Sequence, residues 1–306
     1  MTVSIVALGG GHGLSVTLRA LRQLECEPIA IVGTGDDGGS SGRLRTHLGV
    51  PPPGDLRMAL AALADEGLWT RVLQHRFGGS GDVEGHALGN LLLVALWEET
   101  GDLVAGLDRL GGVLGARGRV LPNCLEPVEL IADVVTAEGA VREVRGQARL
   151  TASRGRIAAL RLRPERPRAC PEAVAAVYDA SHIVVGPGSW FTSVLSHVLV
   201  PDLAVALREA QGKRILILNA GPQAGETEDF TAVRYLQTWT DLAGGITLDA
   251  VIADPRSVDD PQALTAAADR LGGEVIFESV LAGPGHHNTG SLAAALASVL
   301  GRLGWR

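Results

Sequence analysis

The chain has 306 residues, of which 46% are hydrophobic and 20% charged, enough to bury one large α/β domain or two smaller ones. The net charge of -7 and the 4% of aromatic residues argue against a general nucleic-acid surface, which needs basic stripes and stacking platforms. Three separated cysteines favour neither a disulfide framework nor a zinc site. Without a basic leader or a membrane-spanning apolar stretch, the sequence predicts a cytoplasmic protein with no membrane insertion.

The N-terminal segment has the pattern of a parallel β-α-β unit. An apolar run at 3–8 ends in a glycine loop at 9–13, leucines then recur at helical spacing, and an apolar strand follows at 29–32. The loop therefore lies at a helix N-terminus, where unpaired N–H groups and the helix dipole favour an anion. We expect Gly10, Gly11 and Gly13 to contact the phosphates of a ligand.

A second loop, at 35–45, follows the second strand and combines two acids with glycines, serines and arginines. Glycine N–H groups and serine hydroxyls can surround an anion, arginines donate to phosphate, and aspartates can hold a hard cation or accept from ribose hydroxyls. A turn that only links a strand to a helix is the alternative. The predicted ligand contacts here are Asp36, Asp37, Gly38, Gly39, Ser40, Ser41 and Arg43, with Asp36 and Asp37 as candidate Mg²⁺ ligands.

Two common nucleotide-binding fingerprints do not occur. The G-x-G-x-x-G pattern starting at Gly9 would require glycine at Leu14, and a P-loop requires a lysine, whereas Lys213 is the only lysine of the chain. Arginine must therefore neutralise any phosphate, and Arg45 and Arg57 join Arg43 as candidates.

The order of apolar runs predicts a Rossmann-like, doubly wound, mostly parallel sheet within a single domain spanning 1–306. Between 127 and 165 the pattern changes to short alternating runs at 128–135, 141–150 and 157–162, separated by turn signals. These runs predict a small antiparallel β insertion.

Polar glycine loops also follow two predicted strands of the second half, at 186–193 and 219–227. In open α/β sheets ligands bind beyond the carboxyl ends of the strands, so all of these loops are expected to meet at one crevice. The predicted contacts from this half are Gly188, Ser189, Thr192, Ser193, Asn219, Gln223, Glu226 and Thr227.

Two further segments of the first half carry candidates. Asp55, at the end of a proline-rich turn, is expected to cap the following helix, but with Arg57 it is also a candidate site residue. His86 and Asn90 flank a glycine before an apolar helix, which suits either a substrate contact or a helix cap.

The polar motifs of the chain, taken in order, resemble the YvcK-type gluconeogenesis factors. The motifs are Gly-Gly-Gly-His-Gly-Leu-Ser at 9–15, Asp-Asp-Gly-Gly-Ser-Ser-Gly-Arg-Leu-Arg at 36–45, Pro-Pro-Pro-Gly-Asp-Leu-Arg at 51–57, His-Ala-Leu-Gly-Asn at 86–90, Arg-Gly-Arg-Val-Leu-Pro at 117–122, Gly-Pro-Gly-Ser-Trp-Phe-Thr-Ser at 186–193 and Gln-Ala-Gly-Glu-Thr at 223–227. The chain departs from the family at Phe191 and Phe230, where tyrosine is common, and at Gly221-Pro222. The family is related to the CofD-like 2-phospho-lactate transferases, which act on a guanosine diphosphate derivative with Mg²⁺.

The resemblance implies a regulator that binds UDP-sugars such as UDP-N-acetylglucosamine and is associated with gluconeogenic growth and cell shape. A homo-oligomer and a regulatory protein partner are expected. No cofactor is certain, and Mg²⁺ is the one candidate. The alternative is a Mg²⁺-dependent transferase of a phosphorus-containing group, with Asp36, Asp55 and His86 as candidate catalytic residues. The sequence does not decide whether the protein is an enzyme, although a non-catalytic regulator is favoured. A dinucleotide-dependent oxidoreductase is disfavoured because the glycine fingerprint fails.

Overall fold

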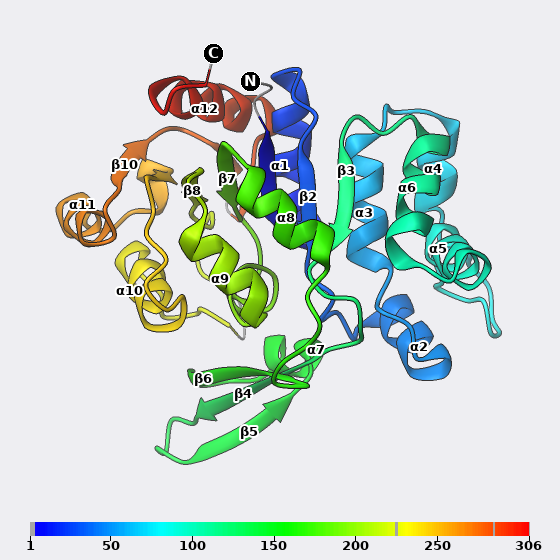
Figure 1. Cartoon of the computed structure of the whole chain (residues 1–306). Coiled ribbons are helices and arrows are strands. Elements are labelled where there is room, and N and C mark those ends of the chain that lie inside the picture. Colours follow the sequence, from blue (N-terminus) through cyan, green and yellow to red (C-terminus); the bar gives the residue numbers. More distant parts are fainter. Residues whose placement is uncertain (1–3, 224–225, 284, 306) are drawn as a thin grey trace.

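A computed structural model of the chain describes residues 4–223, 226–283 and 285–305. Its centre is a seven-stranded sheet, all parallel, in the order β10-β9-β8-β7-β1-β2-β3 (Figure 1). The strands are β1 Ile5–Gly9, β2 Ile29–Val32, β3 Arg119–Pro122, β7 His182–Val185, β8 Lys213–Ile217, β9 Ala250–Ala253 and β10 Glu274–Phe277. The predicted Rossmann-like, doubly wound sheet is confirmed.

The strand order reverses beside β1. From β1 the chain moves outward through β2 to β3, whereas β7 returns to the other side of β1 and the chain then moves outward through β8 and β9 to β10. The loops after β1 and β7 therefore leave adjacent strands toward opposite halves of the sheet. The place where the strand order reverses, between β1 and β7, is the switch point of the sheet. A crevice opens there beyond the carboxyl ends of the two strands.

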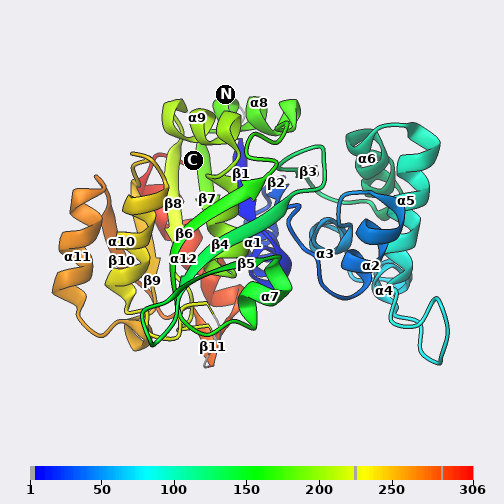
Figure 2. The same ribbon diagram turned by 90° about the horizontal axis from the view of Figure 1, so that it is seen from below.

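Helices cover both faces of the main sheet because its strands are apolar on both sides. In β1, Ile5 and Ala7 belong to one core and Val6 and Leu8 to the other, as the two-residue period of a strand requires. Figure 2 shows α1 and α12 on one side of the sheet and α8 and α9 on the other. The helices of the first face are α1 Gly11–Gln23, α3 Gly54–Leu63 and α12 Thr289–Arg302, and those of the second are α8 Pro171–Asp179, α9 Pro201–Glu209, α10 Ala232–Leu242 and α11 Pro261–Arg270.

A group of helices extends the molecule beyond β3 (Figure 1). It consists of α2 Gly39–Leu48, α4 Leu68–Gln74, α5 Leu88–Thr100 and α6 Leu103–Leu114. The segment 35–45 is therefore a loop only as far as Gly38, and its serines and arginines lie on a helix that ends at Gly49 with φ +68°. Glycine takes this left-handed conformation without a steric cost, so it stops the helix there.

The predicted antiparallel insertion is confirmed as a three-stranded sheet, β5-β4-β6, of β4 Glu129–Val135, β5 Val141–Arg145 and β6 Arg156–Arg163. The prediction of one strand over 141–150 is wrong in its second part, because Gly146 turns the chain at φ +89° and Gln147–Thr151 form the short helix α7. Figure 1 shows this sheet beyond the carboxyl ends of the main strands, and Figure 2, from below, shows it lying across that edge. The division into a single domain stays a prediction.

The remaining elements are short. They are the hairpin β11 Leu281–Gly283 with β12 His286–His287, the π-helix Trp190–Val194, and the 3₁₀ turns Leu195–His197 and Pro255–Ser257. Over residues 4–223, 226–283 and 285–305, no single helix is long and apolar enough to cross a membrane. Two consecutive helical segments, Trp190–His197 and Pro201–Glu209, are together long and apolar enough for a span, but the chain bends by 69° between them.

Candidate functional site

The switch point holds a cavity of about 1050 Å³, which we call the crevice. The loop after β1 and the loop after β7 form two of its walls, and the loops after β2 and β8 reach it from either side. The predicted residues that line it are Gly10, Gly11, Gly13, Asp36, Asp55, Arg57, Gly188, Ser189, Ser193, Asn219 and Gln223. The four loops thus meet at one place, as a doubly wound sheet requires.

The two glycine loops pack directly against each other. A Cβ at Gly13 would lie 2.2 Å from the carbonyl oxygen of Pro187, so no other residue fits without moving a loop. The hydroxyl of Thr17 on α1 donates to the carbonyl oxygen of Gly186 at 2.9 Å and fixes the same contact. Helix α1 begins at Gly11, and Gly10 caps it without a side chain, so its first N–H groups face the crevice. A helix N-terminus of this kind attracts phosphate.

Asp55 does not act as a helix cap, contrary to the sequence-based expectation. Helix α3 begins at Gly54, and its N-cap position is Pro53, which makes no side-chain cap. The Asp55 carboxyl instead approaches the glycine loop so closely that a Cβ at Gly10 would be 2.6 Å from its Oδ2. Burial and the neighbouring Asp36 raise the pKa of Asp55 to about 7, against the opposing effects of the Gly11 N–H and the Arg57 guanidinium. Asp55 can therefore exchange a proton near neutral pH.

The two adjacent aspartates after β2 have different positions. Asp36 lines the crevice and its Oδ1 accepts a hydrogen bond from the N–H of Gly38 at 3.0 Å. Asp37 does not line it, and its Oδ1 accepts from the backbone N–H of Ala148, the second residue of α7, at 2.8 Å. Asp37 therefore ties the antiparallel insertion to the edge of the main sheet.

The residues of the crevice fit a Mg²⁺ ion that is coordinated partly by protein carboxylates and partly by the phosphate of a bound molecule. Asp36 and Asp55 are the two carboxylates that face the crevice, and Mg²⁺ is commonly held by one or two carboxylates together with substrate phosphates. The described part of the chain contains no cluster of three or more histidine, cysteine or acidic side chains that could hold a metal ion by themselves. The Mg²⁺ assignment to Asp36 and Asp37 stays a prediction, and Asp55 is better placed than Asp37 to share it.

Arg57 is held in the crevice wall by a chain of buried polar side chains. Its Nε donates to Asn90 Oδ1 at 2.8 Å, Asn90 Nδ2 donates to Ser40 Oγ at 2.9 Å, and Ser40 Oγ lies 2.9 Å from His86 Nδ1. Ser40, Asn90 and His86 do not line the crevice themselves. They lie behind Arg57 and fix the orientation of its buried guanidinium in the crevice wall.

Burial is the largest cause of the pKa shifts of Arg57 and His86. Burial lowers the pKa of Arg57 to about 10, and the nearby Arg76 acts in the same direction. Arg57 is still a cation at pH 7. Burial also lowers the pKa of His86, as do Arg43 and His47, so His86 is neutral at pH 7 and can accept from Ser40.

The other predicted contacts from α2 have structural roles. Ser41 Oγ accepts from the N–H of Gly54 at 3.1 Å and so joins α2 to α3. Arg43 donates to the carbonyl oxygen of Glu84. Neither these residues nor Gly38 and Gly39 line the crevice.

Hydrogen bonds connect the loop after β7 with the loop after β8. Asn219 Oδ1 accepts from the N–H of Gly188 at 3.0 Å, and Gln223 Oε1 accepts from Asn219 Nδ2 at 3.0 Å and from the N–H of Trp190 at 3.1 Å. The N–H of Gln223 donates to Thr227 Oγ1 at 2.8 Å. The crevice wall on this side is therefore a single hydrogen-bonded unit.

Glu226 lies behind this wall with Thr192 and Ser189. The Ser189 hydroxyl donates to Glu226 Oε1, and Thr192 Oγ1 lies 3.3 Å from the same oxygen. Burial raises the pKa of Glu226, against these hydrogen bonds. Ser189 lines the crevice, whereas Thr192, Glu226 and Thr227 are buried and support it.

Sequence reasoning missed several crevice residues. They include His12, Ser15, Val16, Arg19, Met58, Gln74, Arg76, Gln147, Gly285, His286 and His287. A signal existed for the histidines, because Gly283-Pro284-Gly285-His286-His287-Asn288 is one more polar glycine segment after a strand. Gln147 carried no such signal, since only the folding of the insertion back over the sheet brings it to the crevice.

These features define the class of protein: a doubly wound α/β protein with a polar crevice, lined by glycine loops and a helix N-terminus, at its switch point. Residues 5–275 match the family described as 2-phospho-L-lactate transferase CofD. A protein of Mycobacterium tuberculosis H37Rv with the name "Putative gluconeogenesis factor" is 48% identical over 99% of this chain and 92% of its own length. The "Gluconeogenesis factor" of Bacillus subtilis is 38% identical over 84% of this chain and 80% of its own.

The fold has a close counterpart among solved structures. The crystal structure of a member of the UPF0052 family from Bacillus halodurans superposes with a TM-score of 0.88 at 33% sequence identity, covering 97% of this chain and 99% of that one. The chain belongs to the CofD family, within its branch of gluconeogenesis factors.

Proposed function

We propose that this protein is a cytoplasmic regulator that binds a nucleotide-sugar, of the UDP-sugar class, in the crevice. One observation carries the proposal: the N-terminus of α1, its glycine loop and the buried Arg57 converge on the same crevice as Asp36. The first three supply donors for a diphosphate, and a carboxylate can accept from ribose hydroxyls.

Both ends of such a ligand have suitable partners in the crevice. Asn219, Gln223 and Ser189 offer neutral hydrogen-bonding groups, which suit the hydroxyl and amide groups of a sugar. Arg76 also lines the crevice, and it adds a second cation close enough to Arg57 to lower the pKa of that residue. A volume of about 1050 Å³ is sufficient for a ligand of this size.

The names of the relatives support the biological part of the proposal. Because relatives up to 48% identical are named gluconeogenesis factors, we assign this chain a role in growth on gluconeogenic carbon sources, with control of cell shape as a linked role. The regulator acts as a homo-oligomer and through a protein partner in this scheme.

A second function, transfer of a phosphorus-containing group, is favoured by one observation: the pKa of Asp55 lies near 7 inside the crevice. As a carboxylate, Asp55 would accept the proton of an acceptor hydroxyl while that oxygen forms a bond to phosphorus and the nucleotide leaves with the electrons of the broken P–O bond. Arg57 would stabilise the negative charge on the phosphoryl oxygens. A bound Mg²⁺ would neutralise phosphate charge, and Asp36 is its best-placed ligand.

Titration calorimetry with UDP-N-acetylglucosamine, GDP and NAD, each with and without Mg²⁺, tests both functions when the recovered ligand is examined by mass spectrometry. If the protein is a regulator, it should bind the uridine nucleotide selectively, and the recovered ligand should be intact. Mg²⁺-dependent binding of GDP, or a cleaved ligand, would favour the transferase.

The matched variants are Arg57→Gln and Arg109→Gln. The first removes the buried crevice cation, and the second removes the same charge from an exposed position on α6. Nucleotide binding that survives Arg57→Gln as well as it survives Arg109→Gln would contradict binding in the crevice.

A further inference from the structure

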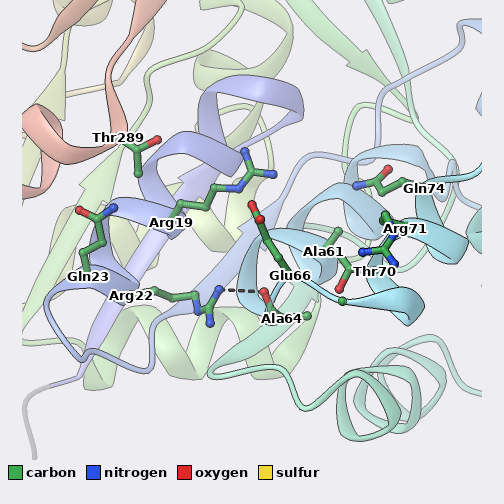
Figure 3. A pocket seen from close by; sticks show the side chains of 11 residues that line it. Arg19, Arg22, Gln23, Ala61, Ala64, Glu66, Thr70, Arg71, Gln74 and Thr289 are labelled. Carbon is green, nitrogen blue, oxygen red and sulfur yellow. Dashed lines mark hydrogen bonds between the residues drawn. The ribbon is translucent and has the colours of Figure 1, made fainter.

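A second cavity, which we call the α1–α4 cavity, adjoins the crevice. It has a volume of about 620 Å³ and is bounded by α1, the C-terminal part of α3, α4 and the first residue of α12 (Figure 3). Small residues account for the space, because Ala61, Ala64 and Gly67 leave the gap between the helices unfilled. Within the described part of the chain, no residue of the glycine-rich and polar sequence motifs lines this cavity.

The charge of the α1–α4 cavity is mostly positive. Arg19, Arg22 and Arg71 line it together with a single acid, Glu66. The terminal nitrogens of Arg22 are already engaged, since Nη1 donates to the carbonyl oxygen of Ala64 at 2.8 Å and Nη2 pairs with an aspartate outside the cavity. The remaining two arginines therefore carry the charge that a ligand would meet.

The side chains of Arg19 and Arg71 make no hydrogen bond or ion pair within residues 4–223, 226–283 and 285–305. Figure 3 shows Arg19 on the α1 side of the cavity and Arg71 on the α4 side, with the side chain of Glu66 between them. Two guanidinium groups that face one cavity from different helices, without an internal partner, are suited to hold an external anion.

The two cavities share part of their walls. Arg19 and Gln74 line both the α1–α4 cavity and the crevice, whereas Arg71 lines only the former and Arg57 only the latter. An occupant of the α1–α4 cavity would thus fix two side chains that also contribute to the crevice. Arg71 and Arg57 allow the two sites to be tested separately.

We propose that the α1–α4 cavity binds the phosphate group of a small phosphorylated sugar, as a site separate from the crevice. Arg19 and Arg71 bind the phosphate oxygens, and Thr70 and Gln23 add neutral donors. The Glu66 carboxylate, which would repel a bare phosphate, accepts from sugar hydroxyls beside it. The site goes beyond the proposed function and does not depend on it.

The test is calorimetric titration of the full chain with glucose 6-phosphate, inorganic phosphate and glucose. We expect glucose 6-phosphate to bind more tightly than inorganic phosphate, and glucose not to bind. Arg71→Gln and Arg19→Gln are expected to weaken glucose 6-phosphate binding by about 10-fold to 100-fold, because each removes a charge-assisted hydrogen bond, whereas Arg109→Gln leaves it unchanged. Equal loss in all three variants would mean unspecific charge attraction and overturn the proposal.

A parallel titration with UDP-N-acetylglucosamine separates this site from the crevice. If the α1–α4 cavity is a separate site, Arg71→Gln lowers glucose 6-phosphate affinity but changes nucleotide-sugar affinity by less than about 2-fold, and Arg57→Gln does the reverse. Loss of glucose 6-phosphate binding in Arg57→Gln but not in Arg71→Gln would place the phosphate in the crevice and overturn the proposal. If the protein binds no nucleotide, the proposed function is refuted, but the binding of glucose 6-phosphate in the α1–α4 cavity is not affected.

Glu66→Gln distinguishes a sugar phosphate from phosphate alone. Removal of the carboxylate should tighten the binding of inorganic phosphate. The affinity ratio of glucose 6-phosphate to inorganic phosphate should therefore become smaller. An unchanged preference would contradict the role of Glu66 as the sugar contact.

Discussion

Asp37, in the loop after β2, accepts a hydrogen bond at 2.8 Å from the backbone N–H of Ala148, which lies 111 residues further along the chain at the start of α7. The packing there is close, because a Cβ at Gly146 would lie 2.1 Å from Asp37 Oδ2. This contact holds the antiparallel insertion over the crevice and brings Gln147 into the crevice wall.

Replacement of Asp37 by alanine should loosen the insertion. The N–H of Ala148 loses its acceptor, so we expect faster hydrogen exchange in 146–151 and a loss of about 1 kcal/mol in the free energy of unfolding. Hydrogen-exchange mass spectrometry measures the first effect and urea denaturation the second. Asp82→Ala, at an exposed position, is the control, and equal exchange in both variants would show that the contact does not hold the insertion.

Gly13→Ala should disturb the crevice and Gly112→Ala should not. The alanine methyl group at 13 would lie 2.2 Å from the Pro187 carbonyl oxygen, whereas at 112, within helix α6, nothing lies within 4 Å. We expect a loss of about 1–3 kcal/mol in the first variant and a small gain in the second. Thermal denaturation checks both, and a Gly13→Ala protein as stable as the wild type would contradict the close contact of the two loops.

The titration of Asp55 makes stability depend on pH. Its pKa is raised in the folded state from 3.8 to about 7, so the folded protein binds the extra proton, and the resulting stability is present below pH 4 and lost as the pH rises to 7. Asp55→Asn should remove this dependence and stabilise the protein at pH 8 by up to about 4 kcal/mol relative to wild type. Urea denaturation at pH 5 and pH 8 is the measurement, and an Asn variant with an unchanged pH profile would refute the raised pKa.

Asp36 contributes to the same titration. Because its negative charge raises the pKa of Asp55, Asp36→Asn should shift the pH dependence of stability toward lower pH. The variant keeps the size of the side chain and an oxygen for the Gly38 N–H. A pH profile that does not move would mean that burial alone raises the pKa of Asp55.

Asn90→Ala should affect both stability and nucleotide binding, although Asn90 does not line the crevice. It leaves Arg57 Nε without its buried acceptor and Ser40 Oγ with His86 as its remaining partner, which costs about 1–3 kcal/mol. Arg57 also loses its fixed orientation, so nucleotide affinity should fall by about 10-fold. Calorimetry at a temperature where the variant is fully folded separates the two effects, and unchanged affinity would deny Asn90 a positioning role.

The sequence by itself determined the sheet, the insertion and the family. Apolar runs such as Ile29–Val32 and His182–Val185 are typical of strands covered on both faces, and the alternating runs after 127 indicate an antiparallel sheet. The position of the crevice followed too, since ligand sites in such sheets lie beyond the carboxyl ends of the strands.

Only the tertiary structure decided which polar residues face the crevice. Ser40, His86 and Asn90 looked like contacts but form a buried chain behind Arg57, and Asp37 holds the insertion while Asp36 faces the crevice. A sequence motif records which residues are close along the chain. The direction of each side chain depends instead on packing between helices and loops that are far apart in sequence, which neither periodicity nor local propensity encodes.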